Sequence, residues 1–140
     1  NGWRANIEGK SYLFSYDPKS LEDIEFPETI SFDGVVEIDA TYESNSSYKE
    51  DIARSIFEFA SLLSGSSIYV RPGFTANSSF DIPIITCEDA TPFVPVLYYK
   101  NSNQTLITHQ GSCIIIESQD GNSFLASTDR IIYKLLGIME

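Results

Sequence analysis

The feature that most constrains the fold is a change of hydrophobic period in the first half of the chain. Over residues 35–42 the side chains alternate between apolar and polar, which predicts a strand with one buried face. Over residues 48–64 the apolar side chains recur every three or four positions, which predicts an amphipathic helix. Ser47 and Glu50 have the spacing of a capping box at its start. Because each element has one apolar face to bury, the helix is expected to pack on a sheet.

The second half of the chain is rich in short β-branched and apolar segments separated by turn residues. They predict strands at 68–70, 82–86, 94–99, 105–108 and 113–117. Short polar connections join the last three, which are predicted to form an antiparallel meander. A second helical pattern covers about 123–136 and leaves Asp129 and Arg130 between its apolar ridges, where they are expected to face water. Residues 17–29 are acidic, contain Pro27 and predict an exposed loop.

These elements predict an α/β or α+β fold, with a mixed, largely antiparallel sheet and two amphipathic helices packed against it. The 140 residues suit one globular domain, and no linker or internal repeat divides them. The chain begins with Asn1 instead of Met, so we expect residues 1–140 to be a domain excised from a larger precursor. Apolar runs stay far below the roughly 18 residues that span a bilayer, which predicts no transmembrane segment in the visible chain.

The chain carries a net charge of −11, and most of this charge lies in one region. Residues 17–51 hold eleven acidic residues and two lysines. Such a surface repels nucleic-acid phosphates and anionic lipids, so no nucleic acid is expected to bind, and the expected partner is a basic protein surface. We assign the acidic interaction face to Glu22, Asp23, Glu25 and Glu28. Arg71 is predicted to pair with an acid of this region. The alternatives are a solvated face that only maintains solubility, and a divalent-cation site without EF-hand spacing.

The common phosphate-binding and catalytic motifs are absent from the sequence. It contains no Gly-rich nucleotide loop, no nucleophile elbow and no two-histidine zinc helix, so no cofactor and no metal ion are predicted. A zinc site built from Cys87, His109 and Cys113 would still need a carboxylate from elsewhere.

The two cysteines allow three interpretations. A disulfide between Cys87 and Cys113 would close a loop and stabilise the fold, whereas separate burial would make each a small apolar core residue. The third interpretation is a nucleophilic Cys87, with His109 as the base and Asp89 orienting it. The acidic neighbours of Cys87 disfavour the thiolate that this chemistry needs.

Three N-x-[ST] sequons, at Asn45, Asn77 and Asn103, lie in segments predicted to be loops, where N-glycosylation occurs. A chain with 34 Ser, Thr and Asn residues also contains some sequons by chance. Together with a Cys87–Cys113 disulfide, the sequons favour an extracytoplasmic location, either secreted or at the cell surface.

The C-terminal segment 129–138, with the sequence DRIIYKLLGI, follows Gly121 and an isoleucine-rich strand that begins with a cysteine. It resembles the ends of uncharacterised domains in prokaryotic, especially archaeal, cell-surface proteins. The resemblance covers only this end of the chain. It implies an extracytoplasmic location and no catalytic residue.

Two functions are expected on these grounds. The first is a non-catalytic extracytoplasmic domain for protein interaction or assembly, which acts through the acidic face. The alternative is a thiol-dependent enzyme or redox protein that uses Cys87 with His109 and Asp89. The first is favoured because the recognisable catalytic motifs are missing, and whether the protein is an enzyme stays open.

Overall fold

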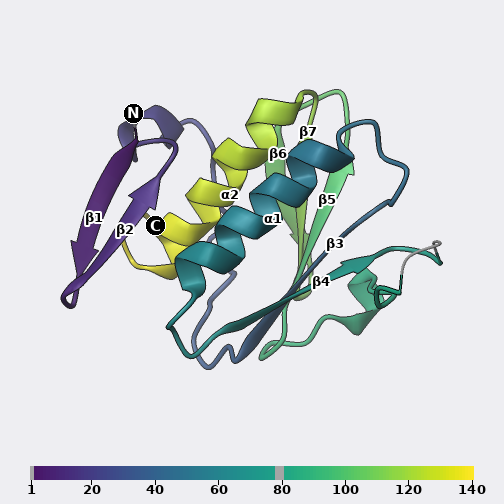
Figure 1. Cartoon of the computed structure of the whole chain (residues 1–140), viewed down its shortest axis with the longest axis horizontal. Coiled ribbons are helices and arrows are strands. Elements are labelled where there is room, and N and C mark those ends of the chain that lie inside the picture. Colours follow the sequence, from purple (N-terminus) through teal and green to yellow (C-terminus); the bar gives the residue numbers. More distant parts are fainter. Residues whose placement is uncertain (1, 78–80) are drawn as a thin grey trace.

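The computed structural model describes residues 2–77 and 81–140 of the chain, so Asn1 and the sequon serine Ser79 lie outside the described residues. The elements are β1 (Trp3–Ile7), β2 (Lys10–Phe14), the 3-10 helix η1 (Lys19–Leu21), β3 (Glu37–Tyr42), α1 (Lys49–Leu63), β4 (Tyr69–Phe74), the 3-10 helix η2 (Cys87–Asp89), β5 (Val96–Asn101), β6 (Leu106–Gln110), β7 (Cys113–Ser118) and α2 (Gly121–Leu135). Together they form an α+β fold (Figure 1).

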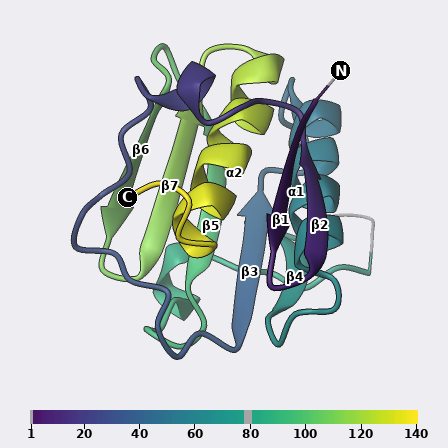
Figure 2. The same ribbon diagram turned by 90° about the vertical axis from the view of Figure 1, so that its left-hand side faces the viewer.

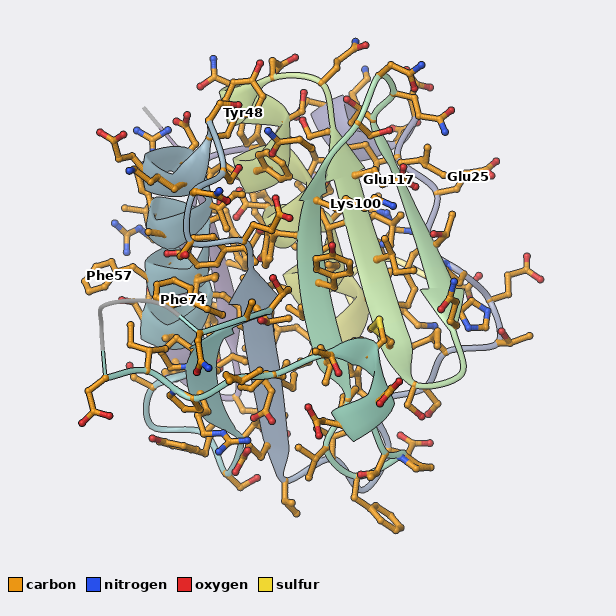
Figure 3. The ribbon with its side chains drawn as sticks, turned by 90° about the vertical axis from the view of Figure 1, so that its right-hand side faces the viewer. Glu25, Tyr48, Phe57, Phe74, Lys100 and Glu117 are labelled. Atoms are coloured by element: carbon orange, nitrogen blue, oxygen red, sulfur yellow. A yellow bond between two sulfur atoms is a disulfide. The ribbon has the colours of Figure 1, made fainter. Side chains whose placement is uncertain are left out.

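Five strands form a mixed sheet in the order β4-β3-β5-β7-β6, and β1 pairs with β2 in a separate antiparallel hairpin. β3 is parallel to β4 and β5, and β5 is parallel to β7, whereas β6 is antiparallel to β7. Both helices lie on one face of the five-stranded sheet, and the segment 81–95 crosses the other face (Figures 1 and 3). The hairpin lies against the outer side of the helices (Figure 2).

The sheet is mixed, as predicted, but parallel pairing predominates in it, and the expected meander of the last three strands is wrong. β5 pairs with β7, and β6 lies at the edge. Parallel neighbours need long crossovers, which α1 and the connection 75–95 supply. The connection 102–105 is short but can reach across one strand, since that step is about 10 Å and each extended residue spans about 3.3 Å.

The main core lies between the helices and the sheet. Ile38 and Ala40 of β3 and Leu97 of β5 point toward the helices and are fully buried. The helices contribute fully buried side chains at helical spacing, namely Ile52, Phe59, Phe124, Ile131 and Ile132. The two predicted amphipathic patterns thus form the helices that cover this face, within about two residues of the expected bounds.

The hairpin is joined to the helices by an aromatic cluster. The ring of Tyr133 on α2 lies 4.3 Å from that of Phe14 on β2 and 5.7 Å from that of Trp3 on β1, measured between centroids. Phe14 and Tyr133 are fully buried. The hairpin therefore extends the core beyond the layer formed by the helices.

The connection between β4 and β5 closes part of the opposite face of the sheet. Ile85 packs there against Val96 and Cys113, and its carbonyl accepts a 2.8 Å hydrogen bond from the buried Thr41 hydroxyl. A disulfide joins Cys87 in η2 to Cys113 in β7, with the Cα atoms 5.2 Å apart. The sequence left open whether the two cysteines pair or are buried separately, and in this structure they pair.

Gly73 in β4 lets this connection approach the sheet closely. A Cβ atom on Gly73 would lie 2.5 Å from Cδ1 of Ile85 and 2.9 Å from the carbonyl oxygen of Pro83. Because backbone would have to move, we expect Gly73→Ala to lower the free energy of unfolding by about 1–3 kcal/mol in urea denaturation. Tyr69→Phe, on an exposed position of the same strand, serves as the control. Equal midpoints for both variants would contradict the close approach.

Two predictions about local structure are wrong. α1 begins after Tyr48 without a side-chain cap, and the Ser47 hydroxyl instead accepts a hydrogen bond from Asn101. Residues 82–86 form no strand and touch the sheet ladder through one isolated bridge at Ile84. The physical reason is that this segment crosses over the sheet instead of joining its edge.

Two further expectations, about exposure, are also wrong. The predicted loop 17–29 contains η1, and its Leu21 and Phe26 are buried. Asp129 and Arg130 do not face water, because they are 0% and 5% exposed. The period of α2 was interpreted as one buried stripe, whereas the hairpin and the segment 17–29 cover a second side of this helix.

Candidate functional site

Three of the four acidic residues assigned to the interaction face line one cavity. Glu22, Glu25 and Glu28 surround a hollow of about 770 Å³ beside β6, whereas Asp23 is exposed outside the lining. The loop that carries them runs past β6, and the C-terminal end of the chain lies next to it (Figure 2). Glu25 projects from this side of the molecule, away from Phe57 on α1 (Figure 3).

The acidic loop is held in place by its apolar residues. Leu21 and Phe26 are buried, and the ring of Phe26 packs against that of Phe32 with centroids 5.8 Å apart. The cavity wall contains the apolar residues of the loop and one residue of β6, namely Ile24, Phe26, Pro27 and Ile107. The glutamates are therefore presented around an apolar wall on a fixed backbone.

Arg130 of α2 fastens the loop from the inner side of the cavity. Its Nε donates a 2.8 Å hydrogen bond to the Ile24 carbonyl, its Nη2 donates to the Glu140 carbonyl, and its guanidinium lies 5.9 Å from the centre of the Phe26 ring. Nη1 is buried and has no hydrogen-bond partner among the described residues. Burial lowers the pKa of Arg130 from its usual value. Arg130 is thus a buried cation bonded to carbonyl groups.

The charge around the cavity is acidic at the surface and basic inside. Glu22, Glu25 and Glu28 are exposed, as is Glu140, and these four outnumber the two basic lining residues, Arg130 and Lys134. Arg130 is nearly inaccessible to water, and Lys134 is half-buried. An approaching molecule therefore meets the carboxylates first, which favours a cationic group over an anionic one.

Each residue of the predicted nucleophilic triad has another partner. Cys87 is in the disulfide, the Asp89 carboxylate accepts the Thr86 N–H at 2.9 Å, and Nε2 of His109 lies 3.1 Å from the Thr29 hydroxyl. The thiol-dependent enzyme or redox protein stays a prediction, and it requires the disulfide to be reduced first. Within residues 2–77 and 81–140, no group of three His, Cys, Asp or Glu residues is placed to hold a metal ion.

Arg71 pairs with acids of the region 17–51, as predicted. Its Nη2 lies 2.9 Å from a carboxylate oxygen of Asp39, and its Nε lies 3.4 Å from one of Glu37. Asp39 is 2% exposed, and its buried carboxylate forms an ion pair with the partly exposed guanidinium of Arg71. The hydrogen bond with Asp39, together with burial, raises the pKa of Glu37. The cluster ties β3 to β4.

A second carboxyl pair lies between the two helices and the end of β2. The Asp129 carboxyl is fully buried, and its Oδ2 accepts the backbone N–H groups of Ser15 at 3.1 Å and Tyr16 at 3.0 Å. Glu58 of α1 accepts a 2.9 Å hydrogen bond from the Ser15 hydroxyl. Burial, and after it the neighbouring carboxyl group of Glu58, raises the pKa of Asp129 to about 9. Through its two backbone hydrogen bonds, Asp129 anchors the chain that follows the hairpin to α2.

The sequence did not reveal the burial of two residues of α2. Arg130 lines the cavity, and Asp129 holds the chain that follows the hairpin. A signal for Asp129 was present, since Ile132 and Tyr133, three and four positions later, are large side chains on the same helical side. Burial of a charged residue at such a position follows only if another element covers that side. The sequence does not identify the hairpin as this element.

The three sequon asparagines, Asn45, Asn77 and Asn103, are exposed and lie outside helices and strands. In the described part of the chain, no helix is long and apolar enough to cross a membrane. No family model, curated protein or solved structure matches this chain.

Proposed function

We propose that the protein is a non-catalytic extracytoplasmic domain for interaction or assembly, and that it binds a basic segment of a partner protein at the acidic cavity. The observation that carries this proposal is the common placement of Glu22, Glu25 and Glu28 around one hollow with an apolar wall. A Lys or Arg side chain can lay its aliphatic stem on such a wall while its charge meets a carboxylate at the rim.

The size of the cavity suits a peptide segment. A hollow of about 770 Å³ falls in the range of pockets that enclose ligands of several residues or one drug-sized molecule. Opposite charges on partner and cavity raise the association rate and fix the orientation more than they raise affinity. The domain is therefore suited to rapid and salt-sensitive binding.

The extracytoplasmic part of the proposal is supported by the disulfide. Disulfides persist in oxidising compartments and are rare where thiols are kept reduced. The acidic composition agrees with a domain that avoids nucleic acids and anionic lipid surfaces.

The proposal predicts that a triple variant, E22Q/E25Q/E28Q, loses affinity for cationic peptides. The probe is a short, fluorescently labelled peptide rich in Lys and Arg, titrated at low salt with anisotropy as the readout. Exposed ion pairs contribute roughly 0.2–1 kcal/mol each, so removing three carboxylates should weaken binding about tenfold. Wild-type binding should also weaken as salt is raised.

The control is the variant E8Q/E43Q/E50Q, which removes the same charge from exposed positions outside the cavity lining. If the control loses as much affinity as the cavity variant, the peptide senses only net charge and the cavity is not its site. If neither variant changes binding, the acidic face is only a solvated surface.

A further inference from the structure

Two of the sequons are brought together by the parallel topology of the sheet. Asn45 follows β3 by three residues, and Asn103 follows β5 by two. β3 and β5 are parallel neighbours, so their carboxyl ends meet at one end of the sheet. Tyr48, which follows the Asn45 turn, marks this end at the top of Figure 3. Asn77 follows β4 at the same end. The other residues of its sequon lie outside the described residues, so the inference concerns Asn45 and Asn103 only.

A hydrogen-bond network holds the two sequon loops next to each other. Asn101, the last residue of β5, accepts a 2.8 Å hydrogen bond from the Ser46 hydroxyl and donates a 2.9 Å hydrogen bond to the Ser47 hydroxyl. The turn that carries Asn45 is thereby fixed against the point where the Asn103 connection begins. The side chains that hold the two loops together are Ser46 and Ser47 of the first sequon and Asn101 of β5.

The two acceptor side chains are free to be modified. Asn45 and Asn103 are exposed, and neither side-chain amide makes a hydrogen bond within the described chain. A substituent on either nitrogen therefore breaks no native contact. The Thr105 hydroxyl of the second sequon is buried in the folded chain, so we expect the modification of Asn103 to precede the folding of this segment.

We propose that Asn45 and Asn103 carry N-linked glycans, which together cover the carboxyl end of β3 and β5. In each transfer the side-chain nitrogen forms a bond to the anomeric carbon of a sugar. The bond from that carbon to the diphosphate of a lipid-linked oligosaccharide donor breaks, the electron pair leaves with the diphosphate, and the nitrogen loses one proton. The inference rests on the extracytoplasmic part of the proposed function.

The glycans have a consequence for where partners bind. A hollow of about 180 Å³, lined by Glu43, Ser46, Tyr98 and Asn101 among others, lies between the turn that carries Asn45 and the end of β5. In open sheets with parallel strands, this is the end at which ligands usually bind. A glycan on Asn45 would lie beside this hollow and restrict the access of a protein partner, whereas the cavity beside β6 would stay open.

The test is peptide mapping and intact mass of the protein isolated from the cells that produce it. We expect glycopeptides at Asn45 and Asn103, and Asn45→Gln and Asn103→Gln should each remove the mass of one glycan. Asn122→Gln, an exposed asparagine outside any sequon, should change no glycan.

An unmodified Asn45 or Asn103 in the secreted protein would overturn the inference, because the shared cover needs both. This failure is distinguishable from failure of the proposed function. The binding of cationic peptides to the wild-type and triple-variant proteins is measured on unglycosylated protein and does not depend on the modification.

Discussion

Replacing Asp129 by asparagine is expected to stabilise the protein at alkaline pH and to remove most of the pH dependence of its stability. The Asn amide oxygen can accept the N–H groups of Ser15 and Tyr16, and its NH₂ group can donate to Glu58. The variant therefore keeps the bonds of a protonated Asp129 but has no proton to lose. The measurement is the free energy of unfolding in urea between about pH 4 and pH 10.

The sign follows from the difference between the folded and unfolded pKa values. In the folded chain the pKa of Asp129 is raised to about 9, from the ordinary value of 3.8. Between these two pH values the folded state holds a proton that the unfolded state has released, so stability falls as pH rises. The stability that the proton on Asp129 contributes is fully present below the pKa of the unfolded state. It is lost as the pH rises through the pKa of the folded state. At roughly 1.4 kcal/mol per pKa unit, we expect a loss of several kcal/mol in the wild type.

Other charged and titratable groups lie around Asp129. Glu58 faces Asp129 from α1, and Asp17 and Glu58 add negative charge near Tyr133. Burial raises the pKa of Tyr133 and of Tyr99, so neither ionises before Asp129 does. The steep part of the wild-type profile therefore belongs to Asp129, whose pKa the nearby Glu58 helps to raise.

The matched control is Asp23→Asn, which removes the same charge from an exposed position. Its profile should remain parallel to that of the wild type. A parallel profile for Asp129→Asn as well would contradict the buried, protonated state of Asp129. A large loss of stability at every pH would show that the amide cannot replace the carboxyl in this network.

Removal of the disulfide is the second large expected effect. Cys87 and Cys113 are separated by 26 positions, and the loop-entropy relation gives about 3.5 kcal/mol for a loop of this size. Besides this loss, the connection 75–95 would no longer be fastened to β7. We expect the double variant C87A/C113A to unfold at a clearly lower urea concentration than the oxidised wild type.

Reductant provides the internal control for this prediction. It should lower the unfolding midpoint of the wild type toward that of the double variant, and it should leave the double variant unchanged. Equal midpoints for oxidised wild type and double variant would show that the disulfide contributes nothing. Intact mass of the protein from its own source, with and without reductant, tests whether the pair is oxidised there. A free, rapidly alkylated Cys87 would favour the thiol-dependent alternative.

The local elements were accessible from the sequence because each depends on neighbours along the chain. Alternation over 35–42 and helical spacing over 48–64 predict a strand and a helix, and the structure has β3 and α1 at these places. The expectation that only one face of this strand is buried is wrong, because Asp39 and Thr41 on its polar face are buried under the segment that carries Ile85 and beside Arg71. The prediction that Arg71 pairs with an acid of the region 17–51 is confirmed by Asp39 and Glu37. Alternation along β5 likewise buries Tyr99, whose hydroxyl lies 2.7 Å from that of Thr128, on the helical side.

The candidate site was predictable only in part. The acidity of Glu22, Glu25 and Glu28 is visible in the sequence, but their placement around one cavity depends on β6, α2 and the C-terminal end. The basic inner wall was missed because Arg130 was expected to face water. An exposed arginine and a buried one at the same helical position are identical in the sequence, since the covering segment lies more than 100 residues away along the chain.

The sequence by itself determined the two helices, the approximate places of the five strands of the main sheet and the excess of negative charge. The tertiary structure decided strand order, the pairing of Cys87 with Cys113, the burial of Asp129 and Arg130, and the meeting of the Asn45 and Asn103 loops. The physical reason is the separation along the chain of the residues that make each contact. Backbone periodicity reports one buried face over a few residues, whereas strand order and second-side burial depend on contacts between segments far apart in the chain, which no local pattern encodes.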